Sequence, residues 1–97
     1  MKKRKGDCYE VAGRKVMEDT HLLLCHGVAH NTLTGRFMGH AWNELGDMVF
    51  DFSNGNNIVM ERKRYYKLGR IKKVRKYTSE EAMKLMLKHE NFGPWGK

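Results

Sequence analysis

The chain has 97 residues, enough for one domain over residues 1–97 with a single modest core. Its 19 lysines and arginines exceed its 11 acidic residues, so the formal net charge is +8, which favours acidic or polyanionic partners. Two cysteines do not make a disulfide-stapled scaffold, and no apolar run is long enough to span a membrane. A basic tail over residues 1–6 lacks the apolar stretch of a secretory signal, so we expect a reducing cytoplasm.

The first predicted element is a helix that begins after Asp7. Asp7 suits the N-cap position, and Cys8, Val11, Ala12 and Val16 recur at the helical period. Cys8 therefore begins the apolar face in the first turn, where the positive end of the helix dipole favours a thiolate. The alternative is that Cys8 is a small buried apolar residue, as free cysteines often are.

Residues 20–29 contain three consecutive leucines and predict a buried strand. His21, Cys25, His26 and His30 gather in this region and raise the question of a zinc site. Strand alternation places His21 and Cys25 on one face and His26 and His30 on the other, and no CxxC pair accompanies them. We therefore predict no metal and no organic cofactor, and expect Cys25 to lie in the core.

Residues 37–45 and 48–53 are rich in apolar and aromatic side chains and predict a β-hairpin. Gly46 and Asp47 between them suit a two-residue turn with glycine first. Asparagine, threonine and glycine over residues 31–35 predict the loop that leads into this hairpin.

The hairpin turn sets a register with a chemical consequence. It places Leu45 opposite Met48 and Trp42 opposite Asp51, so that His40 lies one diagonal step from Asp51 on the same face, with about 7–8 Å between their backbone positions across the hairpin. A slip of one residue would send the two side chains to opposite faces. The alternative is a surface histidine and an unrelated aspartate at a strand end.

The remaining elements complete an α+β domain. A turn is predicted over residues 53–57, a helix over 61–68 that ends at Gly69, and a strand over 71–77. A capping box of Thr78 and Glu81 begins a last helix that runs to about His89. The predicted inward stripe of this helix consists of Ala82, Leu85, Met86 and His89. We therefore expect the cysteine-bearing N-terminal helix to pack on an antiparallel sheet, with a C-terminal helix.

A basic tract lies between Arg62 and Lys76, with tyrosines among its charges. Lysine and arginine with interleaved aromatic residues can hold phosphates and stack on bases. The alternative is a solvated charged face, and no known nucleic-acid reading motif is present. The candidate polyanion-binding residues are Arg62, Lys63, Arg64, Lys72, Lys73, Arg75 and Lys76.

Three blocks in the first half of the chain resemble the transglutaminase-like branch of the papain-like cysteine hydrolases. They are Cys8 at a helix start, the letters GHAWNE over residues 39–44 and the letters VFD over residues 49–51. The resemblance implies that Cys8 is the nucleophile, that His40 is the general base and acid, and that Asp51 orients the imidazole. No Gln or Asn precedes Cys8, so the backbone N–H of Cys8 and an unidentified second donor would bind the oxyanion.

The predicted function is acyl transfer on a peptide, amide or thioester bond. Hydrolysis is the default, and deamidation or transglutamination would use the same groups. Trp42 and Tyr9 are candidate substrate contacts, although a core position is the commoner place for a tryptophan. The expected partner is a peptide or protein substrate, which the basic tract would attract if it is acidic. The alternative is a small basic module that binds nucleic acid or another polyanion on a hydrolase-like fold without turnover.

Overall fold

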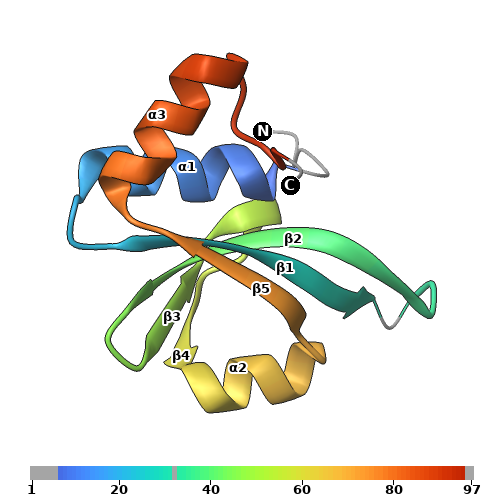
Figure 1. Cartoon of the computed structure of the whole chain (residues 1–97). Helices are drawn as coiled ribbons and strands as arrows, with labels where there is room; N and C mark the ends of the chain where they lie inside the picture. The colour runs from blue at the N-terminus through green and yellow to red at the C-terminus, as the bar shows by residue number, and fades with distance from the viewer. Residues whose placement is uncertain (1–6, 32, 96–97) are drawn as a thin grey trace.

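The computed structural model describes residues 7–31 and 33–95, so the predicted tail over residues 1–6 lies outside it. The fold is α+β, with a cysteine-bearing N-terminal helix packed on a five-stranded antiparallel sheet and a C-terminal helix, as the sequence predicts (Figure 1). The strand order is β4-β3-β2-β1-β5. In chain order the elements are α1 (Cys8–Glu18), β1 (Leu23–Asn31), β2 (Arg36–Leu45), β3 (Met48–Asp51), the 3-10 turn η1 (Ser53–Gly55), β4 (Ile58–Glu61), α2 (Arg62–Gly69), β5 (Lys72–Tyr77) and α3 (Ser79–His89).

The sheet separates two apolar clusters. Figure 1 shows α1 and α3 on one face of the sheet and α2 on the other. Strand alternation divides neighbouring residues between the two faces, since Leu24 and Ala41 pack with α1 while Cys25 and Trp42 pack with α2. The α1 face also contains Cys8, Ala12, Val16, Leu22 and Ala82, and the α2 face also contains Val49 and Tyr65.

The predicted hairpin register is confirmed. Leu45 pairs with Met48, and Asn43 pairs with Phe50. Gly46 has φ 59°, a left-handed conformation that glycine adopts without steric strain, as the predicted turn requires. Because β3 ends at Asp51, the part of β2 that precedes Asn43 continues past the paired region, and His40 lies in that part.

The sequence analysis missed strand β4, which pairs with β3 at one edge of the sheet. Its four residues alternate between half-buried and exposed side chains, with Ile58 and Met60 turned inward. So short a segment directly after a turn has too few residues for a clear period-two pattern.

Other boundaries differ by a few residues from the prediction. Strand β1 begins at Leu23 because a turn over residues 19–22, closed by bonds to Asp19, occupies the predicted start of the strand. Helix α2 includes Gly69, and Arg70 takes the left-handed conformation that ends it. The capping box of α3 is present, but His89 is exposed, so the inward stripe ends at Met86. No helix among the described residues is long and apolar enough to cross a membrane.

Candidate active site

His40 and Asp51 meet where strand β2 passes the end of β3. The His40 Nε2 atom lies 2.8 Å from Asp51 Oδ2, so the predicted diagonal pair on one face is confirmed. The carboxylate of Asp51 is buried and the imidazole is largely buried. A contact of this length between largely buried groups is a strong, charge-assisted hydrogen bond when the ring is protonated.

Asp51 accepts hydrogen bonds on both carboxylate oxygens. Oδ2 receives the Tyr65 hydroxyl at 2.6 Å in addition to His40, and Oδ1 receives the Ser53 hydroxyl at 2.7 Å and the Ser53 backbone N–H at 3.2 Å. Burial alone would raise the pKa of this carboxyl, but the bonds from His40, Tyr65 and Ser53 and the charge of His40 lower it overall. Asp51 is therefore held as a carboxylate.

Ser53 and Tyr65 were missed as members of this site. Ser53 follows Asp51 by two residues, and an aspartate that bonds to a backbone N–H two positions later is a known local turn pattern that could have indicated it. Tyr65 comes from α2 and lies 14 positions from Asp51 in the chain, so no spacing rule points to it.

Cys8 is the first residue of α1, and its side chain is close enough to His40 to shift the pKa of that ring. Burial lowers the pKa of His40, but the bond to Asp51, the nearby Cys8 side chain and the charges of both residues outweigh burial and raise the pKa to about 9. The residues predicted as nucleophile, base and orienting group therefore lie around one imidazole ring. Cys8 itself is only 4% exposed.

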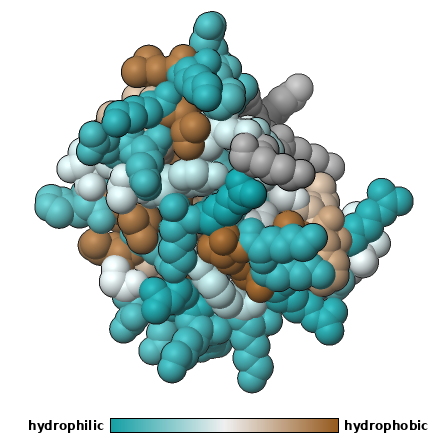
Figure 2. All heavy atoms as spheres, viewed as in Figure 1, coloured by the Kyte–Doolittle hydropathy of each residue, from teal (hydrophilic) through white to brown (hydrophobic). Residues whose placement is uncertain are grey.

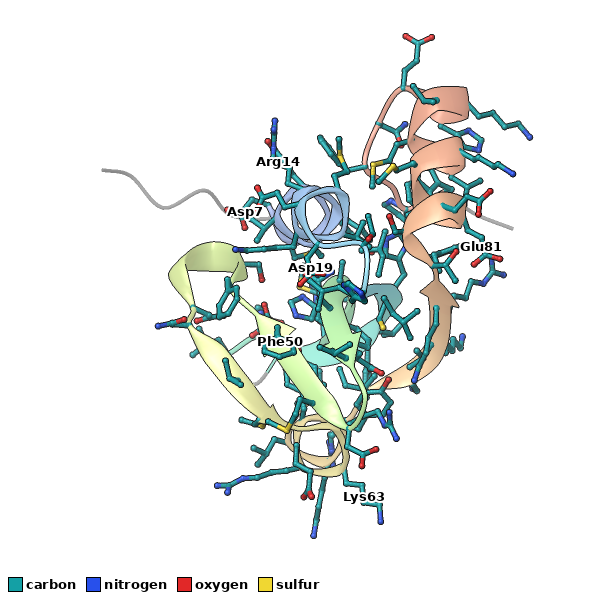
Figure 3. All side chains as sticks on the ribbon, turned by 90° about the vertical axis from the view of Figure 1, so that its left-hand side faces the viewer. Asp7, Arg14, Asp19, Phe50, Lys63 and Glu81 are labelled. Atoms are coloured by element: carbon teal, nitrogen blue, oxygen red, sulfur yellow. The ribbon has the colours of Figure 1, made fainter. Side chains whose placement is uncertain are left out.

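Two hollows lie between α1 and the sheet, and one of them is lined by Cys8. The narrow crevice bounded by Cys8, Ala12 and the end of β3 has no room for a water molecule. A wider groove of about 320 Å³ lies between the C-terminal half of α1 and the β2–β3 hairpin, and it shares Asn43, Phe50 and Phe52 with the crevice. Figure 3 looks onto this side of the molecule, with Phe50 on the sheet and Asp19 above it.

Trp42 lies in the core, the commoner place for a tryptophan, and its substrate role stays a prediction. The side chain is 1% exposed, because the parity of β2 turns it into the α2 cluster. Its ring stacks against His40 with centroids 5.8 Å apart, and its Nε1 donates to Glu44 at 2.9 Å. Trp42 therefore packs against one face of the imidazole of His40.

Tyr9, the other predicted substrate contact, is half-buried beside the site. Its ring meets the edge of His26 at 4.8 Å, and its hydroxyl lies against Gly39. A Cβ at position 39 would come within 2.5 Å of that hydroxyl, which explains why glycine precedes His40 here. The substrate role of Tyr9 stays a prediction.

Cys25 lies in a second polar cluster, around the buried carboxylate of Glu44. Glu44 accepts bonds from Tyr66 at 2.5 Å and from Lys76 at 2.9 Å, in addition to Trp42. Burial and the negative charge of Glu44 raise the pKa of Cys25 well above its ordinary value. Cys25 is fully buried and stays a thiol, as the core assignment predicts.

His26 lies on the face of β1 opposite Cys25, as the alternation predicts, and among three aromatic rings. Its neighbours Tyr9, Tyr77 and Trp95 have ring centroids 4.8–5.2 Å away. Among the described residues, its Nε2 atom has no hydrogen-bond partner. Burial lowers the pKa of His26 to about 4. In the described part of the chain, no group of three or more His, Cys, Asp or Glu side chains is placed to hold a metal ion.

The basic tract forms α2 and the edge strand β5. Two of its predicted polyanion ligands bond to groups of the fold: Lys76 is bonded to Glu44, and Arg62 bonds to the hairpin turn at Gly46 and Asp47. The surface over α2 is largely hydrophilic in Figure 2, and Lys63 points away from the fold in Figure 3. The exposed basic residues of the tract are Lys63, Arg64, Lys67, Arg70, Lys72, Lys73, Arg75 and Lys76.

The chain matches no family model, no curated protein and no solved structure. Its function must therefore be argued from the contacts of the site and from the sequence pattern that predicts them.

Proposed function

We propose that the chain is a cysteine hydrolase or acyl transferase, similar to the transglutaminase-like enzymes, that acts on a peptide, amide or thioester bond. The observation that carries this proposal is the imidazole of His40, which is bonded to Asp51 through Nε2 at 2.8 Å and has the Cys8 side chain close enough to raise its pKa. A thiol, an imidazole and a carboxylate in this order are the parts needed for nucleophilic acyl transfer.

The position of Asp51 assigns the roles of the two ring nitrogens. A carboxylate accepts but does not donate, so the neutral ring carries its proton on Nε2, and Nδ1 is the nitrogen that we assign to the thiol. Cys8 would transfer its proton to Nδ1, and the resulting ion pair would be stabilised by Asp51 and by the N-terminus of α1. The raised pKa of His40 supports this pairing.

The proposed reaction has two halves. The Cys8 thiolate attacks the carbonyl carbon, the oxyanion forms, and the leaving group departs with the proton from His40, which leaves an S-acyl enzyme. His40 then removes a proton from water or an amine, which attacks the thioester, and the C–S bond breaks to restore the thiolate. The backbone N–H of Cys8 in the first turn of α1 is a candidate oxyanion donor.

Acylation by p-nitrophenyl acetate tests the proposal without knowledge of the natural substrate. We expect intact mass and peptide mapping to find one acetyl group on Cys8 in the wild type and in Cys25→Ser, and none at this position in Cys8→Ser. His40→Ala should acquire the acetyl group much more slowly. Acetylation of Cys8 at the same rate with and without His40 would contradict the proposal.

The exposed charges on α2 and β5 favour polyanion binding as a second candidate function. The charged side chains of α2 are exposed, whereas Tyr65 on the same helix is buried at the Asp51 site, so the two properties should be separable. Replacement of Lys63, Arg64 and Lys67 by Gln should weaken binding of a fluorescent single-stranded oligonucleotide and reduce its salt dependence, because fewer counterions are released. Cys8→Ser should leave that binding unchanged. Oligonucleotide binding that is equal in the Gln variant and the wild type would contradict this second function.

A further inference from the structure

We propose that Tyr65 is a positioning residue that holds the His40–Asp51 pair in its reactive arrangement. This inference rests on the function proposed above, and it adds a fourth side chain to that site, from a different element. Tyr65 is buried within α2, and its hydroxyl reaches across the sheet face to the end of β3.

The Tyr65 hydroxyl contacts both members of the pair. It lies 2.6 Å from Asp51 Oδ2 and 3.0 Å from His40 Nε2, while Nε2 is itself 2.8 Å from the same Oδ2 atom. Three polar atoms thus form a closed triangle. Trp42 packs against both Tyr65 and His40, with ring centroids 5.6 Å and 5.8 Å away, so the triangle has a rigid aromatic support.

The protons available in this triangle determine whether the Tyr65 phenol donates to or accepts from each partner. The single hydroxyl hydrogen of Tyr65 goes to Asp51, which can only accept, so the phenol oxygen presents lone pairs to Nε2. An Nε2–H then has two acceptors, whereas an unprotonated Nε2 would face lone pairs on both sides. Burial and the charge of Asp51 raise the pKa of Tyr65, so the hydroxyl keeps its hydrogen. Tyr65 therefore favours the tautomer that leaves Nδ1 for the thiol.

Tyr66 provides a matched comparison on the same helix. Its hydroxyl also bonds to a buried carboxylate, that of Glu44, at 2.5 Å. Tyr66→Phe removes the same group from the same helix without touching the His40–Asp51 pair. A general loosening of α2 would show in both variants, whereas a positioning role belongs to Tyr65 alone.

The experiment measures iodoacetamide alkylation of Cys8 across pH, together with the NMR titration of the His40 ring, in wild type, Tyr65→Phe, Tyr66→Phe and His40→Ala. We expect Tyr65→Phe to slow Cys8 alkylation at pH 7 by about three- to tenfold, the range for the loss of one hydrogen bond. The titration midpoint of His40 should fall, because the imidazolium loses one acceptor. Tyr66→Phe should leave both quantities unchanged.

Each outcome has a separate meaning. If His40→Ala alkylates like the wild type, the proposed function fails. If His40→Ala is slow but Tyr65→Phe matches the wild type or Tyr66→Phe, only the role of Tyr65 is overturned. Should Tyr65→Phe unfold, which labelling of Cys25 would reveal, the wild-type chain decides. In the wild type, the NMR chemical shift of the Tyr65 ring carbon that bears the hydroxyl must change with pH at the His40 midpoint, while that of Tyr66 must not. A Tyr65 shift that does not follow the His40 titration would refute the proposal.

Discussion

His40 and His26 lie on neighbouring strands and are both largely buried, yet their surroundings shift their pKa values in opposite directions. His40 is bonded to the carboxylate of Asp51 and has the Cys8 side chain nearby, and its pKa rises to about 9. His26 lies among the rings of Tyr9, Tyr77 and Trp95, and burial lowers its pKa to about 4. Burial disfavours the charged ring in both places, so the difference comes from the buried anion beside His40.

The two histidines also oppose each other in the pH dependence of stability. The raised pKa of His40 contributes stability that is present below about pH 6.5 and is lost as the pH rises towards 9. The lowered pKa of His26 acts with the reverse sign: its contribution is present above about pH 6.5 and is lost as the pH falls towards 4. The two opposite shifts follow from the presence or absence of a charge partner beside the buried ring.

Removal of the Asp51 carboxylate should abolish the difference in pKa between His40 and His26, and it should have the largest effect on turnover. Asp51→Asn should lower turnover of an activated ester by about a hundredfold or more, because the amide can hold the wrong tautomer of His40. The NMR midpoint of His40 should fall below its ordinary value, since only the burial effect and Cys8 remain. Asp47→Asn, at an exposed carboxylate in the hairpin turn, is the control and should leave turnover unchanged. Turnover retained in Asp51→Asn would contradict the role of Asp51.

Low pH should show the effect of His26 on the stability of the fold. The free energy of unfolding should fall by roughly 3 kcal/mol between pH 7 and pH 4 on account of His26, since its ring must accept a proton in an aromatic environment. His26→Phe keeps a ring but cannot titrate, so urea unfolding of this variant at several pH values should show a flatter acid side. An unchanged slope in His26→Phe would mean that His26 does not control acid stability.

Alkylation should show which histidine acts on the thiol. Iodoacetamide at neutral pH should label Cys8 well ahead of Cys25, and His40→Ala should slow labelling of Cys8 by about tenfold because the ion pair is lost. His26→Phe is the matched control and should keep the wild-type rate. Equal rates for the two cysteines, or equal effects of the two histidine variants, would leave Cys8 as an ordinary core residue.

The smallest expected effect concerns the outer support of the carboxylate. Ser53→Ala removes one hydroxyl bond to Asp51 Oδ1, while the backbone N–H of residue 53 still donates. Cys8 alkylation should slow by only about two- to threefold, because the bonds on Oδ2 persist. A loss as large as that in Asp51→Asn would show that Ser53 contributes more than an outer hydrogen bond.

Short-range rules predicted the parts of the site that lie close together in the chain. The helical period and the N-cap at Asp7 placed Cys8 at the start of α1. The Gly46 turn set the hairpin register, which brought His40 and Asp51 to one face. These features follow from backbone geometry over a few residues, and the same holds for the capping box of α3.

The tertiary structure alone decided which groups surround those residues. Tyr65 reaches Asp51 only because α2 packs on the opposite face of the sheet from α1, and the same packing buries Trp42 and turns Lys76 towards Glu44. His26 and His40 are both strand residues, and no local rule separates a ring beside a carboxylate from a ring among aromatic side chains. That distinction depends on contacts between distant elements, where a desolvated charge requires a partner that sequence spacing does not specify.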